Sequence, residues 1–291
     1  MIEKRQKQKY FIEQLLIAVD IGNSRLKIKI KNKAYAFDYI NGWEKRAVKL
    51  IESYPEQDKL LCYSSVNPYR LRIFRKAVEG KVINSYNVRE LTVEQQILNY
   101  RQIKGIGIDR VLGMIGALEK FKPPLITVDC GTAITINAVD KDNNCLGGAI
   151  LPGIETQIKS LKEHTAGMKD IEISPFLKKV KPAKINVAAG KDTVSAIKTG
   201  VIIGAAATIK EIITMIIKQE FKNDKVQLIL TGGTVDLVYE VLKDSDFNFH
   251  IQSDLVLDGI MLLLKGYVIL VMSHIYEELK RMAEEKNKDN C

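Results

Sequence analysis

The stretch LLIAVDIGNSRLKIKI, residues 15–30, decides the fold. Its apolar first half predicts a buried strand that ends on the carboxylate of Asp20, and its second half predicts another strand that begins almost at once. Between the two strands lie the small residues Gly22, Asn23 and Ser24. Such a turn points several backbone N–H groups into one concavity, which suits the oxygens of a phosphate group.

The same pattern occurs a second time. PLITVDCGTAITINAV, residues 124–139, also runs from an apolar strand into an aspartate, Asp129, and then through a glycine turn into a second strand. Chance is the alternative explanation, because an aspartate often caps a turn. Agreement over the apolar run, the aspartate, the glycine and the following strand favours a duplication. The sequence therefore predicts two similar α/β halves with a cleft between them.

The aspartates that end these strands suggest a metal ion. A carboxylate beside a polyphosphate is repelled unless Mg²⁺ lies between them, directly or through its waters. Asp20 and Asp129 are therefore the metal candidates. The turns offer further contacts to phosphate oxygens, from the side chains of Asn23, Ser24, Thr132 and, if its strand position faces the ligand, Lys27.

The expected domain organisation follows from the duplication. We expect an N-terminal half over residues 15–123 and a C-terminal half over 124–265, joined where Pro123 and Pro124 stop a helix. Residues 1–14 and 266–291 are expected to be extensions. Helices are predicted over 109–121 and 193–221, and a strand over 226–233.

Composition narrows the partners and the compartment. The 291 residues carry a net charge of +9, which makes anionic partners plausible without choosing one. Four scattered cysteines and three scattered histidines argue against a zinc cage or a disulfide framework, so we expect a cytoplasmic protein. The most apolar runs, 201–217 and 260–272, are shorter than the roughly 20 residues that a membrane span needs, so we expect no membrane partner.

A phosphoryl-transfer enzyme also needs a base for the accepting hydroxyl, and Asp109 is the candidate. It precedes an apolar helix, so on residue types alone a plain helix cap is the stronger interpretation. Arg110 stands beside it and offers a fork for a substrate carboxylate, although it is also compatible with a solvated helix start.

No Walker P-loop and no dinucleotide fingerprint occurs, and two facing phosphate turns resemble those of the actin, hexokinase and Hsp70 class. The resemblance implies that the two halves are ribonuclease H-like and that ATP lies in the cleft between them. The ordered motifs are similar to those of type III pantothenate kinases over about residues 15–264. The matching motifs are DIGNSRLK (20–27), GIDR (107–110), DCGTAIT (129–135), GGAILPG (147–153), GKDTVSAIKTG (190–200) and TGG (231–233).

The resemblance implies phosphorylation of pantothenate with ATP and Mg²⁺, the first step of coenzyme A synthesis, by a homodimer. It implies that Asp109 is the general base and that Asp20 helps to place Mg²⁺. The residues implied to hold the phosphates or border the adenosine are Gly22, Asn23, Ser24, Gly131, Thr132, Gly232 and Gly233. Those implied to bind pantothenate are Tyr100, Gly107, Arg110 and, from the partner subunit, Thr193.

Some residues depart from the family pattern. Asn137 stands where the family often has an aspartate associated with a monovalent cation, which argues against a requirement for K⁺ or NH₄⁺. HTAGMK (164–169) and Ile103 also differ from the usual loops. Two alternatives stay open: a non-enzymatic regulator on the same scaffold, and a kinase for another small acid. We expect no nucleic-acid partner, because basic and aromatic residues do not interleave.

Overall fold

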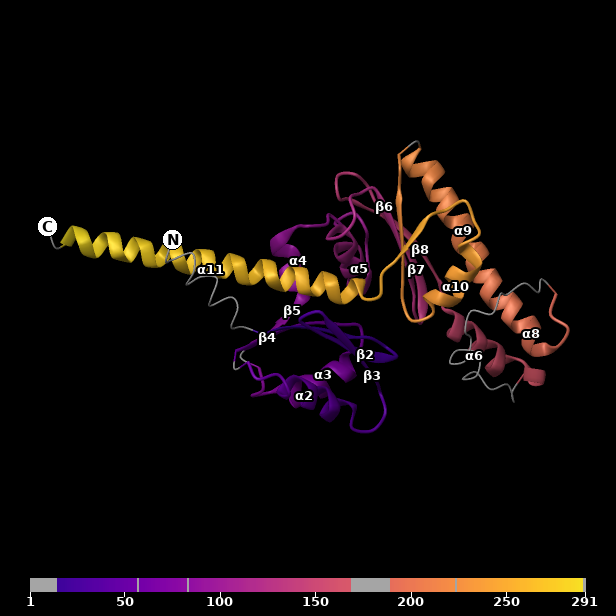
Figure 1. Cartoon of the computed structure of the whole chain (residues 1–291), viewed down its shortest axis with the longest axis horizontal. Helices are drawn as coiled ribbons and strands as arrows, with labels where there is room; N and C mark the ends of the chain where they lie inside the picture. Colours follow the sequence, from indigo (N-terminus) through magenta and orange to yellow (C-terminus); the bar gives the residue numbers. More distant parts are fainter. Residues whose placement is uncertain (1–14, 57, 83, 169–188, 223, 290–291) are drawn as a thin grey trace. The chain divides into compact units, whose positions relative to one another are not determined.

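A computed structural model describes residues 15–56, 58–82, 84–168, 189–222 and 224–289. The chain divides into two compact units, each with its own five-stranded sheet (Figure 1). The first unit holds the described residues up to Ile97 and those from Leu257 onward, and the second holds Leu98–Val256. The predicted extension over 1–14 lies outside the described residues, as does Lys169 at the end of HTAGMK.

The first unit has two helices on one face of its sheet. Its elements are β1 (Leu15–Ile21), β2 (Arg25–Ile30), β3 (Lys33–Asp38), α2 (Trp43–Glu52), β4 (Lys59–Ser65), α3 (Pro68–Val78), β5 (Asn84–Asn87), α4 (Val88–Gln95) and α11 (Leu255–Asp289), which enters this unit at Leu257. The inward residues of β1 and β2, such as Ile17, Val19 and Ile28, pack with Trp43 of α2 and Phe74 of α3.

The second unit repeats this plan. Its elements are α5 (Ile108–Leu118), β6 (Leu125–Cys130), β7 (Ala133–Val139), β8 (Cys145–Pro152), α6 (Ile154–His164), a 3₁₀ turn (Ala166–Met168), α8 (Thr193–Lys198), α9 (Gly204–Ile216), β9 (Gln227–Thr231), α10 (Val235–Leu242) and β10 (Phe249–Ile251). Two π-helical segments, Thr199–Ile203 and Ile217–Phe221, make α8 and α9 parts of one continuous helix, which confirms the long helix predicted over 193–221.

The two sheets have the same topology. The strand order is β3-β2-β1-β4-β5 in the first and β8-β7-β6-β9-β10 in the second. In each, the first three strands are antiparallel, and the first strand also pairs in parallel with the strand that follows a helical connection. Asp20 lies opposite Lys27 in the register of β1 and β2, and Asp129 lies opposite Thr135 in that of β6 and β7. The predicted duplication is therefore confirmed.

The two faces of the second sheet differ in chemistry. Because side chains alternate along a strand, Ile126, Val128 and Cys130 of β6 all point to one face, where they pack with helices α6, α9 and α10. Thr127 and Asp129 point to the other face, and α5 packs against β6 and β7. This second face is polar where it approaches α5.

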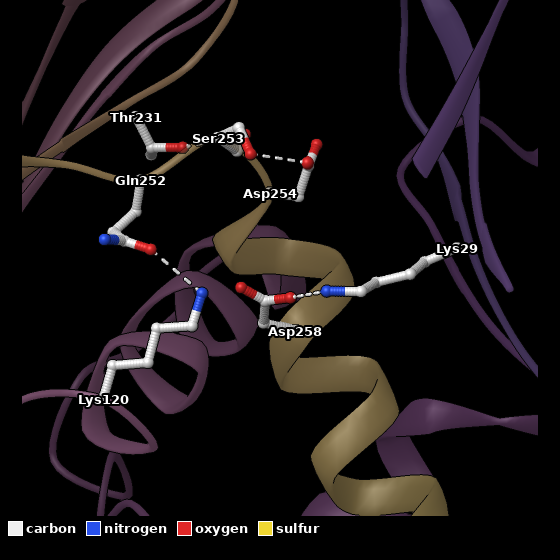
Figure 2. Close-up of polar contacts among 7 residues, drawn as sticks. All are labelled: Lys29, Lys120, Thr231, Gln252, Ser253, Asp254 and Asp258. Carbon is white, nitrogen blue, oxygen red and sulfur yellow. Dashed lines mark hydrogen bonds and ion pairs between the residues drawn. The ribbon is translucent and has the colours of Figure 1, made fainter. Parts of the chain in front are cut away.

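The boundary between the two units lies before α5, at Leu98, and not at Pro123 and Pro124 as the sequence suggests. The reason is that α5 packs on the second sheet rather than the first. The end of the α5 segment is tied to β10, because Lys120 Nζ donates to Gln252 Oε1 at 3.0 Å (Figure 2) and the Phe121 ring lies 4.9 Å from the His250 ring.

Helix α11 carries a buried ion pair near its start. Lys29 of β2 reaches Asp258, which is 3% exposed (Figure 2). Farther along, Gln95 of α4 donates to the carbonyl oxygen of Leu263 at 2.6 Å. These contacts hold α4 and α11 against the first sheet.

Two helices of the described chain, Thr193–Phe221 and Leu255–Glu278, are long and apolar enough to span a membrane by length and composition alone. A third of the apolar window of the first and half of that of the second are buried inside the protein. Core helices of soluble proteins meet the same criterion, so this is weak evidence for a span.

Candidate active site

The turn after β1 is short and open. Gly22 N donates to Arg25 O at 3.2 Å, and Asn23 and Ser24 are exposed. A Cβ at Gly22 would lie 3.3 Å from Arg25 O, which leaves little room for a side chain. The turn thus offers backbone amides and two polar side chains without bulk, as the sequence predicts for a phosphate-binding turn.

Tyr39 supports this turn and was not predicted. Its hydroxyl donates to Gly22 O at 2.9 Å, and the Arg70 guanidinium lies 4.5 Å from the Tyr39 ring centroid. Burial first, and then the Asp20 carboxylate, raise the pKa of Tyr39 above its usual value, and Arg70 opposes them only in part. Tyr39 therefore stays a neutral donor. No local sequence pattern marks Tyr39, because the pairing of β1 with β2 and of β2 with β3 is what brings it close to Gly22.

A row of polar residues crosses the first sheet at Asp20. Lys27 of β2 lies opposite Asp20 on one side, and Ser64 of β4 on the other. Residues directly opposite in neighbouring strands share a face of the sheet, so the ammonium of Lys27 and the carboxylate of Asp20 belong to one surface. Ser64 is fully buried, and among the described residues nothing bonds to its hydroxyl. Ser64 was also not predicted.

The second turn, Gly131–Thr132, is held by hydrogen bonds within the turn and from the start of α6. Gly131 N donates to Ala133 O at 3.1 Å within the turn. Thr132 O accepts from Gly153 N at 2.9 Å and from Thr156 Oγ1 at 2.6 Å, both at the start of α6. A side chain at Gly153 would collide with this turn. The start of α6 therefore requires a glycine to hold the turn in place.

The loop after β9 lies against Asp129. Thr234 donates to Cys130 O through both its backbone N, at 3.1 Å, and its Oγ1, at 2.9 Å. Gly232 has a φ of +104°, and a Cβ there would lie 2.5 Å from Asp129 Oδ1 and from Cys130 N. Gly233 is exposed and has open space around it. Of the predicted pair of glycines, Gly232 thus packs against Asp129, and Gly233 lies on the surface.

Asp109 lies in the first turn of α5 and does not cap it. The cap position belongs to Gly107, which makes no side-chain bond, so Asp109 is not the N-cap residue, although its carboxylate does bond an amide of the first turn. The Asp109 carboxylate accepts from Arg110 N at 2.9 Å. A Cβ at Gly107 would collide with Asp109 Oδ1. Gly107 therefore leaves the space that this carboxylate occupies.

Asp109, Arg110 and Asp129 share one small cavity of about 30 Å³, which is the space of about one water molecule. Its lining is mostly polar and comes from α5, from the polar face of the second sheet and from the start of α11. The residues are Asp109, Arg110, Gly113, Thr127, Asp129, Thr135, Asn137, Thr231 and Leu255. Alternation along β6 and β7 places four of them on one face, a signal that sequence reasoning overlooked.

Two predicted substrate residues lie apart from this cavity. Tyr100 is half-buried, and its carbonyl oxygen accepts from Ile103 N at 3.0 Å. Thr193 is exposed and begins α8, directly after the reciprocal cap formed by Asp192 and Ser195. Neither is among the residues that line the cavity in the described chain.

Asp20 and Asp129 each have the chemistry of a ligand for a magnesium ion that a substrate also binds. Within the described residues, no three His, Cys, Asp or Glu side chains form a metal-binding group. Mg²⁺ at a phosphoryl-transfer site is usually held by only one or two carboxylates together with substrate phosphates and water. Asp20 and Asp129, each directly before a glycine turn, have that character.

This chain is similar in sequence to proteins of a known family. The sequence profile described as Type III pantothenate kinase matches residues 16–215. A protein named Type III pantothenate kinase from Sulfurihydrogenibium sp. is 30% identical over 78% of this chain and 92% of its own. One of the same name from Finegoldia magna is 28% identical over 87% and 97%.

Among solved structures, the activator of the 2-hydroxyisocaproyl-CoA dehydratase from Clostridium difficile with bound ADPNP has a TM-score of 0.52 at 7% identity. The match covers 90% of this chain and 97% of that one. At such low identity the likeness concerns the fold alone, and it agrees with the duplicated, actin-like architecture.

Proposed function

Since this chain belongs to the type III pantothenate kinase family, we propose that it transfers the γ-phosphoryl group of ATP to the primary hydroxyl of pantothenate. The product is 4′-phosphopantothenate, and the reaction is the first step of coenzyme A biosynthesis. The observation that carries the proposal is the pairing of Asp109 and Arg110 at the start of α5, on the cavity that Asp129 also lines.

In this proposal Asp109 accepts the proton of the attacking hydroxyl. A general base must lie within hydrogen-bond reach of that proton. Among the described residues, the Asp109 carboxylate accepts a hydrogen bond from Arg110 N alone, which leaves oxygen lone pairs for a substrate hydroxyl. Arg110 binds the carboxylate of pantothenate, because its guanidinium forms no ion pair with the described residues.

The phosphates of ATP are assigned to the two glycine turns. The amides of Gly22 and Gly131 bond within their own turns, so each turn binds phosphate oxygens through its other backbone amides and through the side chains of Asn23 and Ser24 or of Thr132. Lys27 adds a positive charge beside Asp20. Gly233 borders the adenosine from its exposed position. Asp20 in the first unit and Asp129 in the second are each candidates to hold Mg²⁺, which when bound would neutralise charge on the transferring group.

A monovalent cation is not part of the proposal. The Asn137 oxygen already accepts a hydrogen bond from Arg110 Nε at 2.6 Å, so it is occupied by a cationic side chain. We therefore expect similar turnover in K⁺, NH₄⁺ and Na⁺ salts.

We also propose a homodimer in which Thr193 reaches the partner's pantothenate site. Gly200 and Gly204 of the long helix have open space where a Cβ would stand, which allows another helix to approach closely. Ala205 and Ala206, in contrast, are buried in the core of their own unit. The free thiols of Cys62, Cys130 and Cys145 agree with a reducing cytoplasm.

A coupled assay of ADP release tests the function. With ATP and Mg²⁺, we expect turnover that requires pantothenate and that other small acids and sugars do not replace. A different acid that supports faster turnover would favour the alternative of another small-acid kinase. Absence of any acceptor, together with salt-dependent retention on DNA, would favour a regulator on the same scaffold.

A further inference from the structure

Ser64 of β4 has a buried hydroxyl that lies beside Asp20. The register of the parallel strands β1 and β4 pairs Asp20 with Ser64, so both side chains belong to one face of the first sheet. Ser64 is 0% exposed, and among the described residues its Oγ has no hydrogen-bond partner. A buried hydroxyl without a partner costs free energy, so Ser64 does not stabilise the fold through this group.

The neighbours of Ser64 on this face of β1 and β4 leave Asp20 as its acceptor. Because side chains alternate along a strand, the next residues on the face are Ala18 and Cys62, which pair with each other. Ala18 has no polar side-chain atom, and a thiol is a weak hydrogen-bond partner. An ionised carboxylate, in contrast, accepts at two oxygens, and a serine hydroxyl can rotate to suit its acceptor. Asp20 is therefore the group in these two strands to which Ser64 can donate.

The second sheet repeats the arrangement. There Asp129 of β6 pairs with Thr231 of β9, so a residue with a hydroxyl again stands beside the aspartate that ends a strand. Thr231 Oγ1 donates to Ser253 O at 3.3 Å, which commits its proton to the backbone (Figure 2). The duplication thus places a hydroxyl beside each aspartate, and of the two it is the Ser64 hydroxyl that keeps its proton for a carboxylate.

A carboxylate that holds a metal ion is itself usually hydrogen-bonded by a neighbouring group, which fixes its orientation. We infer that Ser64 is the positioning residue for Asp20, whose carboxylate accepts from the Ser64 hydroxyl at one oxygen and keeps the other for Mg²⁺. The inference rests on the proposed function, in which Asp20 is a candidate to hold Mg²⁺ beside the phosphates of ATP. It adds a residue that acts through Asp20 and contacts neither the metal nor the substrates.

The test measures how much Mg²⁺ strengthens ATP binding. Isothermal titration gives the dissociation constant of ATP in EDTA and in excess Mg²⁺, and the ratio of the first to the second is the gain from the metal. Wild type and Ser64→Ala are compared with Ser65→Ala, a matched control on the opposite face of the same strand. The Ser65 hydroxyl already has partners, because its Oγ donates to Asn67 O and accepts from Asn67 N, both at 3.1 Å. Urea unfolding without Mg²⁺ is the second readout.

We expect Ser64→Ala to lower the gain from Mg²⁺ by about 10-fold or more, as is typical when a metal ligand loses its hydrogen-bond partner. The ATP affinity in EDTA should not change. The urea midpoint of Ser64→Ala should equal or exceed that of wild type, because the substitution removes a buried hydroxyl that has no partner. Ser65→Ala should instead lower the midpoint and keep the gain. In an Asp20→Asn background, Ser64→Ala should not change the gain further.

An unchanged gain in Ser64→Ala would overturn the inference. So would a lowered urea midpoint, since the hydroxyl would then stabilise the fold itself. Because pantothenate-dependent ADP release by wild type tests the proposed function separately, either result would leave that function in place. A wild type whose ATP binding gains nothing from Mg²⁺ would overturn the proposed magnesium site and this inference with it.

Discussion

Gly107 leaves the space that the Asp109 carboxylate fills, since a Cβ at position 107 would collide with Asp109 Oδ1. Gly107→Ala should therefore displace the proposed base and lower kcat by about 10- to 100-fold, which is less than the roughly 10²- to 10⁴-fold expected for complete loss of a general base. The measurement is steady-state ADP release. In the Asp109→Asn background the same change should have little further effect, because coupled residues are not additive. If the two substitutions instead lowered kcat by independent factors that multiply, Gly107 would not act through Asp109.

Lys29 and Asp258 form an ion pair in which Asp258 is buried and Lys29 is partly buried, so loss of the pair should cost stability. Removing one partner of a buried ion pair typically costs about 3 kcal/mol or more, and we expect that loss in the free energy of unfolding of Lys29→Met, measured with urea. Lys31→Met is the matched control, because Lys31 pairs with Glu56 at 2.5 Å but is 61% exposed. It should cost less than about 1 kcal/mol. Equal losses would show that burial of Asp258 is not what makes the pair strong.

Lys27, two residues before Lys29, should matter for ligand binding instead. It lies opposite Asp20, on the face of the sheet that carries that carboxylate. Lys27→Gln removes a charge-assisted contact to phosphate and should weaken ATP binding about 10-fold or more. Isothermal titration with MgATP measures this. Lys33→Gln, at the exposed start of β3, serves as a control. Unchanged affinity in Lys27→Gln would remove this lysine from the site.

Gly232 and Gly233 should separate stability from nucleotide binding. Gly232→Ala would place a side chain at a φ of +104°, where L residues are strained, and would bring its Cβ into a clash with Asp129. The protein should therefore lose at least about 1–3 kcal/mol of stability. Gly233→Ala meets open space and should keep its stability while raising the KM for ATP. Thermal unfolding and ATP kinetics check both. A stable Gly232→Ala with normal activity would contradict the packing described for Asp129.

The fold was predictable because it is encoded locally and twice. Each copy carries its own apolar strand, terminal aspartate and small-residue turn, so Asp20 and Asp129 could be aligned without knowledge of their surroundings. The division between the units was not predictable in the same way. Helix α5 has an apolar face that would pack on either sheet, and only tertiary packing assigns it to the second.

The site was predicted where chemistry follows a motif and missed where it depends on contacts across the sheet. Asp109 and Arg110 stand in a recognisable motif. Tyr39, Ser64 and the contact of Asn137 with Arg110 each join residues far apart in sequence, so no spacing marks them. Alternation of side chains in β7 places Asn137 on the same face as Thr135, but it does not predict which side chain of α5 contacts Asn137.

The most direct test of the account is the turnover of Asp109→Asn with ATP, Mg²⁺ and pantothenate, measured together with its ATP affinity. We predict that kcat falls by about 10²- to 10⁴-fold while the protein stays folded and binds ATP as wild type does. Turnover within a few-fold of wild type, with folding and ATP binding intact, would contradict the assignment of Asp109 as the base.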